Sequence, residues 1–304
     1  MVFLYDGTYP GFLTAVHEIY HKGTSHLEGI RKEGREETLF GNEIHVETSF
    51  LKAEKVAISF GSCCGKEALR WMYRAFLAEE EGKEMKIFYF LRRGFKLKKG
   101  IYRKQREPWV MDILKLCQKV GNEMDKFRGI LRFSELEDGL LFAEIQPTHH
   151  ILPLLAPHFA DRFSTKRWAI YDRNRHEAVV YEKGKVSFVF VEKEEMNLTY
   201  SRGEEDFRQM WRNYYRHMGI EERRNPGVRM NFIPKKYWAH LTEMADPYNR
   251  EDRRMTGLPQ RKRPHQISLD IRNDEFRDVL KLVEKKSAEK LMIEGKKEDS
   301  QVQK

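Results

Sequence analysis

The chain has 304 residues, a formal net charge of +9 and an isoelectric point near 9.2. This length is enough for one large or two small domains with a hydrophobic core, and the positive charge favours a polyanionic partner. Three cysteines exclude a disulfide framework, and no apolar run is long enough to span a membrane, so we expect a cytoplasmic protein.

The first part of the chain, residues 1–126, is predicted to be mainly helical. Val2–Tyr5 has the pattern of a short strand, and Pro10 suits the first turn of a helix that continues to about Tyr20. Val56–Phe60 is compatible with a second short strand. Helical periodicity then predicts helices at Lys66–Glu81, Met85–Leu91 and Trp109–Phe127.

The segment His17–His21 has the H-E-x-x-H pattern, in which two histidines one helical turn apart can hold zinc. The apolar stripe of the same helix runs through Phe12, Ala15 and Ile19, and both histidines project away from it. A zinc ligand needs a protected cleft with a packed surrounding shell. We therefore expect surface histidines, no metal and no cofactor, and the zinc site is kept only as the alternative.

The stretch from Arg92 to Arg106 holds eight Lys/Arg and no acidic residue, with Phe95 and Tyr102 between them. Such a run repels itself unless it is solvated or neutralised by an anion. We predict a mobile strip that contacts nucleic-acid phosphates; a flexible solvated loop is the alternative. The contact residues predicted here are Arg92, Arg93, Lys96, Lys98, Lys99, Arg103 and Lys104.

Residues 127–193 are predicted to form a sheet. Alternating apolar residues indicate strands at Gly129–Leu136 and Leu140–Ile145, joined by a turn with Gly139. A helix at Ile151–Phe163 follows, and then strands at Arg167–Asp172, Glu177–Glu182 and Val186–Val191. This order predicts a largely antiparallel sheet with one helix packed on a face. His158 and Asp172 could supply acid and base groups there, although capping and ion pairing explain them equally well.

Residues 194–246 are predicted to be helical, and Phe207–Met244 combines eight Lys/Arg with seven aromatic residues. Cations neutralise phosphates, and aromatic rings stack on bases. At about 100° per residue, Phe207, Met210, Trp211, Tyr214 and Met218 are predicted to face the core. The predicted nucleic-acid contacts are Arg208, Arg212, Tyr215, Arg216, Arg223, Arg224, Lys235, Lys236 and Tyr237. A solvated arginine face is the alternative.

Residues 1–246 are thus predicted to form one α+β globular unit. Residues 247–304 form an extension with a different composition. It begins with a basic linker that includes Arg253 and Arg263, continues with an amphipathic helical pattern at Glu275–Ile293, and ends in a tail that we expect to be disordered.

Several segments together resemble one family of bacterial proteins, and they occur in the same order over about residues 1–246. The segments are Tyr5–Tyr20, Phe127–Leu136, Ile151–Phe163, Trp168–Arg175 and much of Phe207–Met244. The chain resembles the probable DNA-metabolism proteins, a family of unknown activity. The resemblance implies a gene neighbour that encodes a radical S-adenosylmethionine protein of DNA modification or repair, and in some members fusion to a uracil-DNA-glycosylase-like domain. It supplies no catalytic residues.

These observations lead to a ranked expectation. The sequence contains neither a CxxxCxxC cluster motif nor a glycosylase motif, so we expect a DNA-binding accessory protein in repair or base modification that acts with a partner enzyme. The alternative is a hydrolase or nucleotide-acting enzyme that uses His158 and Asp172, or a metal at His17 and His21. A protein-interaction scaffold that binds an acidic partner is the third reading.

Overall fold

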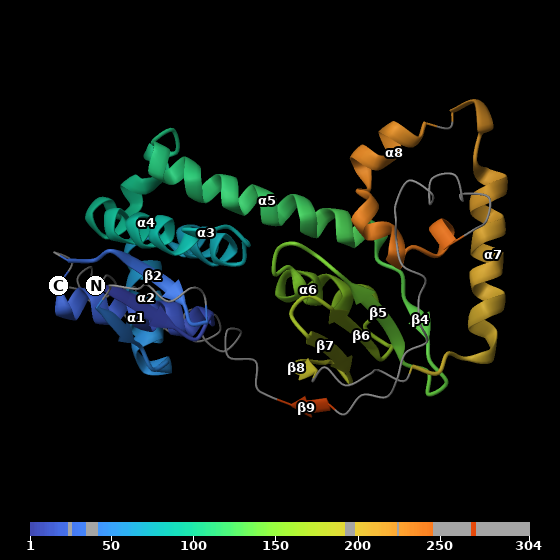
Figure 1. Cartoon of the computed structure of the whole chain (residues 1–304), viewed down its shortest axis with the longest axis horizontal. Helices are drawn as coiled ribbons and strands as arrows, with labels where there is room; N and C mark the ends of the chain where they lie inside the picture. Colours follow the sequence, from blue (N-terminus) through green and yellow to red (C-terminus); the bar gives the residue numbers. More distant parts are fainter. Residues whose placement is uncertain (24–25, 35–41, 192–197, 224, 246–268, 272–304) are drawn as a thin grey trace, which may run out of the picture. The chain divides into compact units, whose positions relative to one another are not determined.

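The computed structural model of the chain describes residues 1–23, 26–34, 42–191, 198–223, 225–245 and 269–271 (Figure 1). By its internal contacts the chain divides into two compact units, the first built on Met1–Val120 and the second on Gly121–Asn273. Both units combine helices with a sheet, so the predicted α+β class is confirmed. The boundary predicted near residue 246, the amphipathic helix and the tail lie outside the described residues. So does the basic linker, except for the short strand Leu269–Ile271, which was not predicted.

The first unit packs helices against a small parallel sheet with the strand order β2-β1-β3. Its elements are β1 (Val2–Tyr5), α1 (Tyr9–Lys22), β2 (Gly29–Lys32), β3 (Glu43–His45), α2 (Phe50–Cys64), α3 (Lys66–Phe76), α4 (Lys83–Leu97), the 3₁₀ helix η1 (Lys98–Lys104) and the beginning of α5 (Pro108–Ile130). The strands β2 and β3 were not predicted, because they are short and half of their residues are polar or charged.

Two predictions for this unit have opposite outcomes. The buried stripe of α1 is confirmed, since Phe12, Ala15 and Ile19 are fully buried. The strand suggested at Val56–Phe60 is wrong, because this segment lies inside α2. Its buried residues, Ala53, Val56, Ala57 and Phe60, recur with helical spacing, which a five-residue window cannot distinguish from a buried strand.

The second unit contains a six-stranded sheet with the order β4-β5-β6-β7-β8-β9. The strands are β4 (Ser134–Glu135), β5 (Leu141–Ile145), β6 (Trp168–Asp172), β7 (Glu177–Glu182), β8 (Lys185–Val191) and β9 (Leu269–Ile271). Only β5 and β6 pair in parallel, because α6 (Leu152–Arg162) connects them as a crossover. The strand predicted at Gly129–Leu136 is much shorter than expected, since α5 continues to Ile130.

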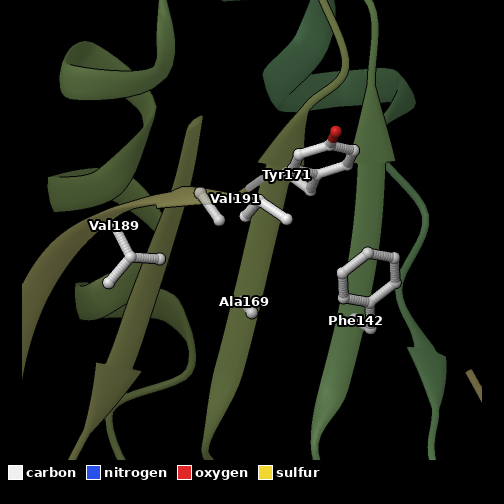
Figure 2. Close-up of a cluster of buried hydrophobic side chains, with 6 residues drawn as sticks. Phe142, Ala169, Tyr171, Val189 and Val191 are labelled. Carbon is white, nitrogen blue, oxygen red and sulfur yellow. The ribbon is translucent and has the colours of Figure 1, made fainter. Parts of the chain in front are cut away.

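Both faces of this sheet carry buried apolar side chains. Figure 2 shows Phe142, Ala169, Tyr171, Val189 and Val191, which gather on one face with Ala178. On the other face, the Trp168 ring stacks on Tyr181 at 5.3 Å between centroids and meets Phe159 of α6 edge-on at 6.3 Å. Side chains that alternate along the strands therefore pack on both faces of the sheet, and the predicted helix, α6, covers one of these faces.

The C-terminal block of the second unit follows the sheet. It consists of α7 (Arg202–Met218), η2 (Glu221–Arg223), α8 (Pro226–Phe232), η3 (Lys235–His240) and η4 (Thr242–Ala245). Its small core is made by Trp238, Leu241 and Met244. The turn predicted around Arg223–Gly227 is shortened by α8, whose first turn is capped by the Asn225 side chain at 3.0 Å from the Val228 amide.

The orientation predicted for α7 is wrong. Phe207 is 56% exposed and Met218 is 65% exposed, and Met210 and Tyr214 are also exposed. Instead, the helix turns Glu204 and Arg208 inward, together with Trp211, whose indole nitrogen donates to Glu243 at 2.9 Å. The inner face of α7 is thus held by paired polar groups, and its apolar face remains at the surface.

Candidate nucleic-acid interface

The basic run that the sequence singles out, Arg92–Arg106, is built into the first unit as folded structure. Its first half is the last part of α4, and η1 continues from it. The predicted mobile strip is therefore a folded part of the first unit. We call this surface the basic strip and define it by Arg92, Arg93, Lys96, Lys98, Lys99, Arg103, Lys104 and Arg106.

Apolar and aromatic residues inside the run hold the basic strip to the unit. Ile101 is fully buried, and the Tyr102 hydroxyl accepts a hydrogen bond from the Ala68 amide at 3.1 Å. The Phe95 ring meets Phe60 edge-on at 5.5 Å. Gly94 permits this contact between α4 and α2, because a Cβ at this position would lie 2.7 Å from the Phe60 ring. The two aromatics predicted between the charges are thus anchors.

Most charges of the basic strip are exposed and, among the described residues, unneutralised; Arg92 is half-buried. Lys96, Lys98, Lys99, Arg103 and Arg106 are exposed, and none forms an ion pair with a carboxylate in the described part of the chain. Lys104 pairs with Glu107 at 3.3 Å, and the Arg93 guanidinium lies over the Trp109 ring at 5.4 Å. Cations held close together without counter-charges form a surface that attracts a polyanion.

Tyr89 is a surface aromatic that the sequence analysis missed. Its side chain is 47% exposed, and its position on α4 is one turn before Arg93 and two turns before Lys96. Residues at this spacing share one face of a helix. Tyr89 lies in the helix predicted at Met85–Leu91 and precedes the charged run, so the cluster of charges does not include it. It gives the basic strip a ring on which a base can stack.

The arginines predicted on α7 have partners within their own unit. Arg208 donates to Glu204 at 2.7 Å and to the Ser134 hydroxyl at 2.7 Å, and it lies over the Tyr200 ring at 4.4 Å. Arg212 donates to Glu205 at 3.1 Å and to Gln209 at 2.9 Å. These guanidinium groups already have the hydrogen bonds that a phosphate would offer, so they are left out of the proposed surface.

The remaining predicted contacts of this block differ in their exposure. Arg216 on α7 and Arg223 on η2 are exposed, Lys235 is half-buried, and Arg224 lies outside the described residues. Tyr215 is half-buried and packs against the core of the block.

Tyr237, which is buried, and Lys236, which is exposed, both contact the buried carboxylate of Glu123 on α5. Glu123 is 7% exposed and accepts hydrogen bonds from the amides of Thr148 at 2.9 Å and His149 at 2.7 Å. The hydroxyl of Tyr237 donates to the same carboxylate, and the Lys236 amine lies 3.5 Å from it. Because Tyr237 is buried, a base has no access to its ring in this conformation.

Hydrogen bonding gives Glu123 an unusual pKa. Burial alone would raise the pKa of the carboxyl, but the hydrogen bonds from Tyr237, His149 and Thr148 outweigh it and hold the pKa below its usual range. These hydrogen bonds join α5, the loop after β5 and η3, which are far apart in the sequence. They therefore fasten the second unit together.

The alternative catalytic residue Asp172 is engaged in the turn that follows β6. Asp172 is completely buried; it accepts from Arg175 at 2.9 Å and from the Asn174 amide at 2.9 Å. Burial raises the pKa of Asp172, against the opposing effect of Arg175. In the described part of the chain, no hydrogen bond or ion pair joins His158 to Asp172. This arrangement stabilises the turn after β6.

The H-E-x-x-H segment likewise lacks a complete metal-binding set. The rings of His17 and His21 lie 4.4 Å apart, and Glu18 between them forms an ion pair with Lys52 at 2.8 Å. Among the described residues, no group of three or more His, Cys, Asp or Glu side chains could hold a metal ion. The pair therefore has no third protein ligand within that part of the chain.

The pairing of Arg208 gives a testable expectation. Replacing Arg208 with alanine leaves Glu204, which is 7% exposed, with an uncompensated charge, so the free energy of unfolding should fall by about 3 kcal/mol. Arg202→Ala, at the exposed start of the same helix, is the control. It should change the free energy of unfolding by less than about 0.5 kcal/mol. Urea titration of both variants measures the difference. Equal, small effects would mean that Arg208 is not a structural residue.

Comparison with known proteins identifies one match. A family model described as a domain of unknown function, DUF4130, matches residues 81–243, which is more than half of the chain. This range includes the basic strip and almost the whole C-terminal block of the second unit. No curated protein matches the chain. Within the described residues, no helix is both long and apolar enough to cross a membrane.

Proposed function

The chain belongs to the DUF4130 family of domains of unknown function, and we propose that it binds DNA through its basic strip as the accessory partner of a repair or base-modification enzyme. The observation that supports this proposal is the set of exposed cations on α4 and η1 that have no counter-charge among the described residues. The net charge of +9 also favours binding to a polyanion such as DNA.

The geometry of the basic strip suits a nucleic-acid backbone. Its cations follow the last turns of α4 and the adjoining η1 on one continuous stretch of chain, and Ile101 and Tyr102 fix that stretch to the core. A fixed surface loses less conformational entropy on binding than a flexible loop. Tyr89 adds one exposed ring beside the charges.

The proposed partner enzyme follows from the resemblance to the probable DNA-metabolism proteins. Members of that family tend to be encoded beside a radical S-adenosylmethionine protein, which supports such a protein as the partner. Of the catalytic candidates, Asp172 is paired with Arg175, and no hydrogen bond or ion pair joins it to His158 in the described residues. Under this proposal the chain delivers or holds DNA, and the partner performs the chemistry. Co-purification with that protein, followed by assays of each protein alone and of both on damaged DNA, tests the division of labour.

DNA binding itself is tested by a salt series. Each phosphate neutralised by a cation releases counterions, so the logarithm of the association constant should fall linearly with the logarithm of the salt concentration. If the exposed cations of the basic strip are engaged, the slope should be about −3 to −5. Fluorescence anisotropy with labelled single-stranded and duplex DNA measures it. A slope near zero, or no binding at low salt, would contradict the proposal.

A further inference from the structure

Tyr20 of α1 is a second exposed aromatic residue next to the basic strip, and only the fold brings it there. Its side chain is 43% exposed. Its ring lies 6.0 Å from the ring of Phe88 and 6.3 Å from the ring of Phe95, measured between centroids, and both of these residues belong to α4. Tyr20 therefore lies along the part of α4 in which the basic strip begins.

Arg92 lies between the aromatic side chains of this surface. It follows Phe88 by four residues and precedes Phe95 by three, so all three share one face of α4. Its charge also acts on Tyr20, because burial raises the pKa of the Tyr20 hydroxyl and Arg92 opposes that rise. Arg92 has no ion pair with a carboxylate among the described residues. Its guanidinium is thus a cation beside Tyr20 without a counter-charge in that part of the chain.

Tyr89 borders the same cations on their other side. The buried ring of Phe88 contacts both exposed tyrosines, since it lies 6.0 Å from Tyr20 and 6.0 Å from Tyr89. At about 100° per residue, Arg92 and Lys96 lie between Phe88 and Tyr89 around the helix. The surface therefore presents two tyrosine rings with two cations between them.

Exposed rings with cations between them suit a strand whose bases are unpaired. The bases of a single strand can stack on aromatic side chains while its phosphates meet the cations, whereas the faces of bases in a duplex are covered by their neighbours. We infer that the basic strip binds single-stranded DNA in preference to duplex DNA, with bases stacked on Tyr20 and Tyr89 and phosphates on Arg92 and Lys96. This selectivity rests on the proposed DNA binding and adds the form of DNA that is bound.

The first test compares a labelled single strand of mixed sequence with the same strand annealed to its complement, by fluorescence anisotropy. The wild type should bind the single strand more tightly. Tyr20→Leu and Tyr89→Leu should each lower single-strand affinity at least about fivefold, since a stacked base is lost, and should leave duplex affinity unchanged. Leucine keeps an apolar contact with Phe88, and circular dichroism checks the fold. Tyr20→Phe and Tyr89→Phe retain the rings and should bind as the wild type does.

Tyr214→Leu in the second unit is the matched control, because it also removes an exposed tyrosine. It should change neither affinity. A wild type that binds duplex DNA as tightly as the single strand overturns the inference, and so do leucine variants at Tyr20 and Tyr89 that keep full single-strand affinity; both results leave the proposed DNA binding in place. Absence of binding to either form contradicts the proposed function itself, and the strand preference with it.

A second test locates the stacked bases directly. A single strand that contains iodouracil cross-links under ultraviolet light to aromatic side chains in contact with it. Mass spectrometry of the digested wild-type complex should find DNA attached at Tyr20 or Tyr89, and the attachment at each position should be lost in its leucine variant. Attachment found only at other residues would overturn the assignment of the two rings.

Discussion

Replacing Lys98, Lys99 and Arg103 with alanine should lower DNA affinity by up to about 100-fold at moderate salt, since each lost phosphate contact costs up to about 1 kcal/mol. The salt slope should decrease by about 2 to 3. All three side chains are exposed on η1, without an ion pair in the described part of the chain, so the fold should be unaffected. Fluorescence anisotropy over a salt series measures both quantities.

A matched control separates the basic strip from net charge. Three exposed lysines lie on β8 or on the loops that adjoin the sheet strands of the second unit, and their replacement by alanine removes the same charge. They are Lys166, Lys183 and Lys185. This variant should keep nearly the full affinity. If both triple variants lose affinity equally, binding follows the total charge of the protein, and the basic strip has no special role.

Lys98 allows stability and binding to be separated at a single position. Its backbone has φ 53° and ψ −135°, a conformation that residues with a Cβ rarely adopt and that glycine adopts readily. Lys98→Gly should therefore leave the free energy of unfolding unchanged or raise it by up to about 1 kcal/mol, while DNA binding weakens. Lys98→Ala removes the charge and keeps the strain. A glycine variant that is less stable would argue against strain at this residue.

Glu123→Ala should lower the free energy of unfolding by at least about 3 kcal/mol. The substitution leaves the amides of Thr148 and His149 and the hydroxyl of Tyr237 without their shared acceptor in a buried site, and each unsatisfied group costs about 1 to 3 kcal/mol. Asp125→Ala, two residues away on α5, removes an exposed pair with Arg128 and should cost less than about 0.5 kcal/mol. Urea titrations at neutral pH compare the two.

The pH dependence of the same pair of proteins gives an independent check. The folded-state pKa of Glu123 is lowered, so its stabilising contribution is fully present above the unfolded value of about 4.3 and is lost as the pH falls through the folded value. The stability difference between wild type and Glu123→Ala should therefore narrow below about pH 4. A difference that widens in acid would show that the carboxyl is not held in its charged form.

Local sequence patterns were sufficient to predict most of the individual helices and strands. The strand at Glu177–Glu182 and the buried stripe of α1 are as predicted. Apolar residues that alternate along a strand, or recur at helical spacing, indicate the buried face when that face packs on an apolar layer. The basic strip was also recognised, since eight cations without an acid are a property of composition. The parallel strands β2 and β3 were missed because short strands with polar residues carry little periodic signal.

What the sequence by itself determined, then, is the fold class, most elements of the sheet and the location of the charge. Only the tertiary structure decided which cations are available and which side of α7 is buried. Arg208 is removed from the surface by Ser134, 74 residues earlier in the chain, and Trp211 is turned inward by Glu243. A helical pattern shows which residues share a face, but the partners that this face meets are distant in the sequence. Burial of paired charges follows from those partners, so no periodicity in the chain predicts it.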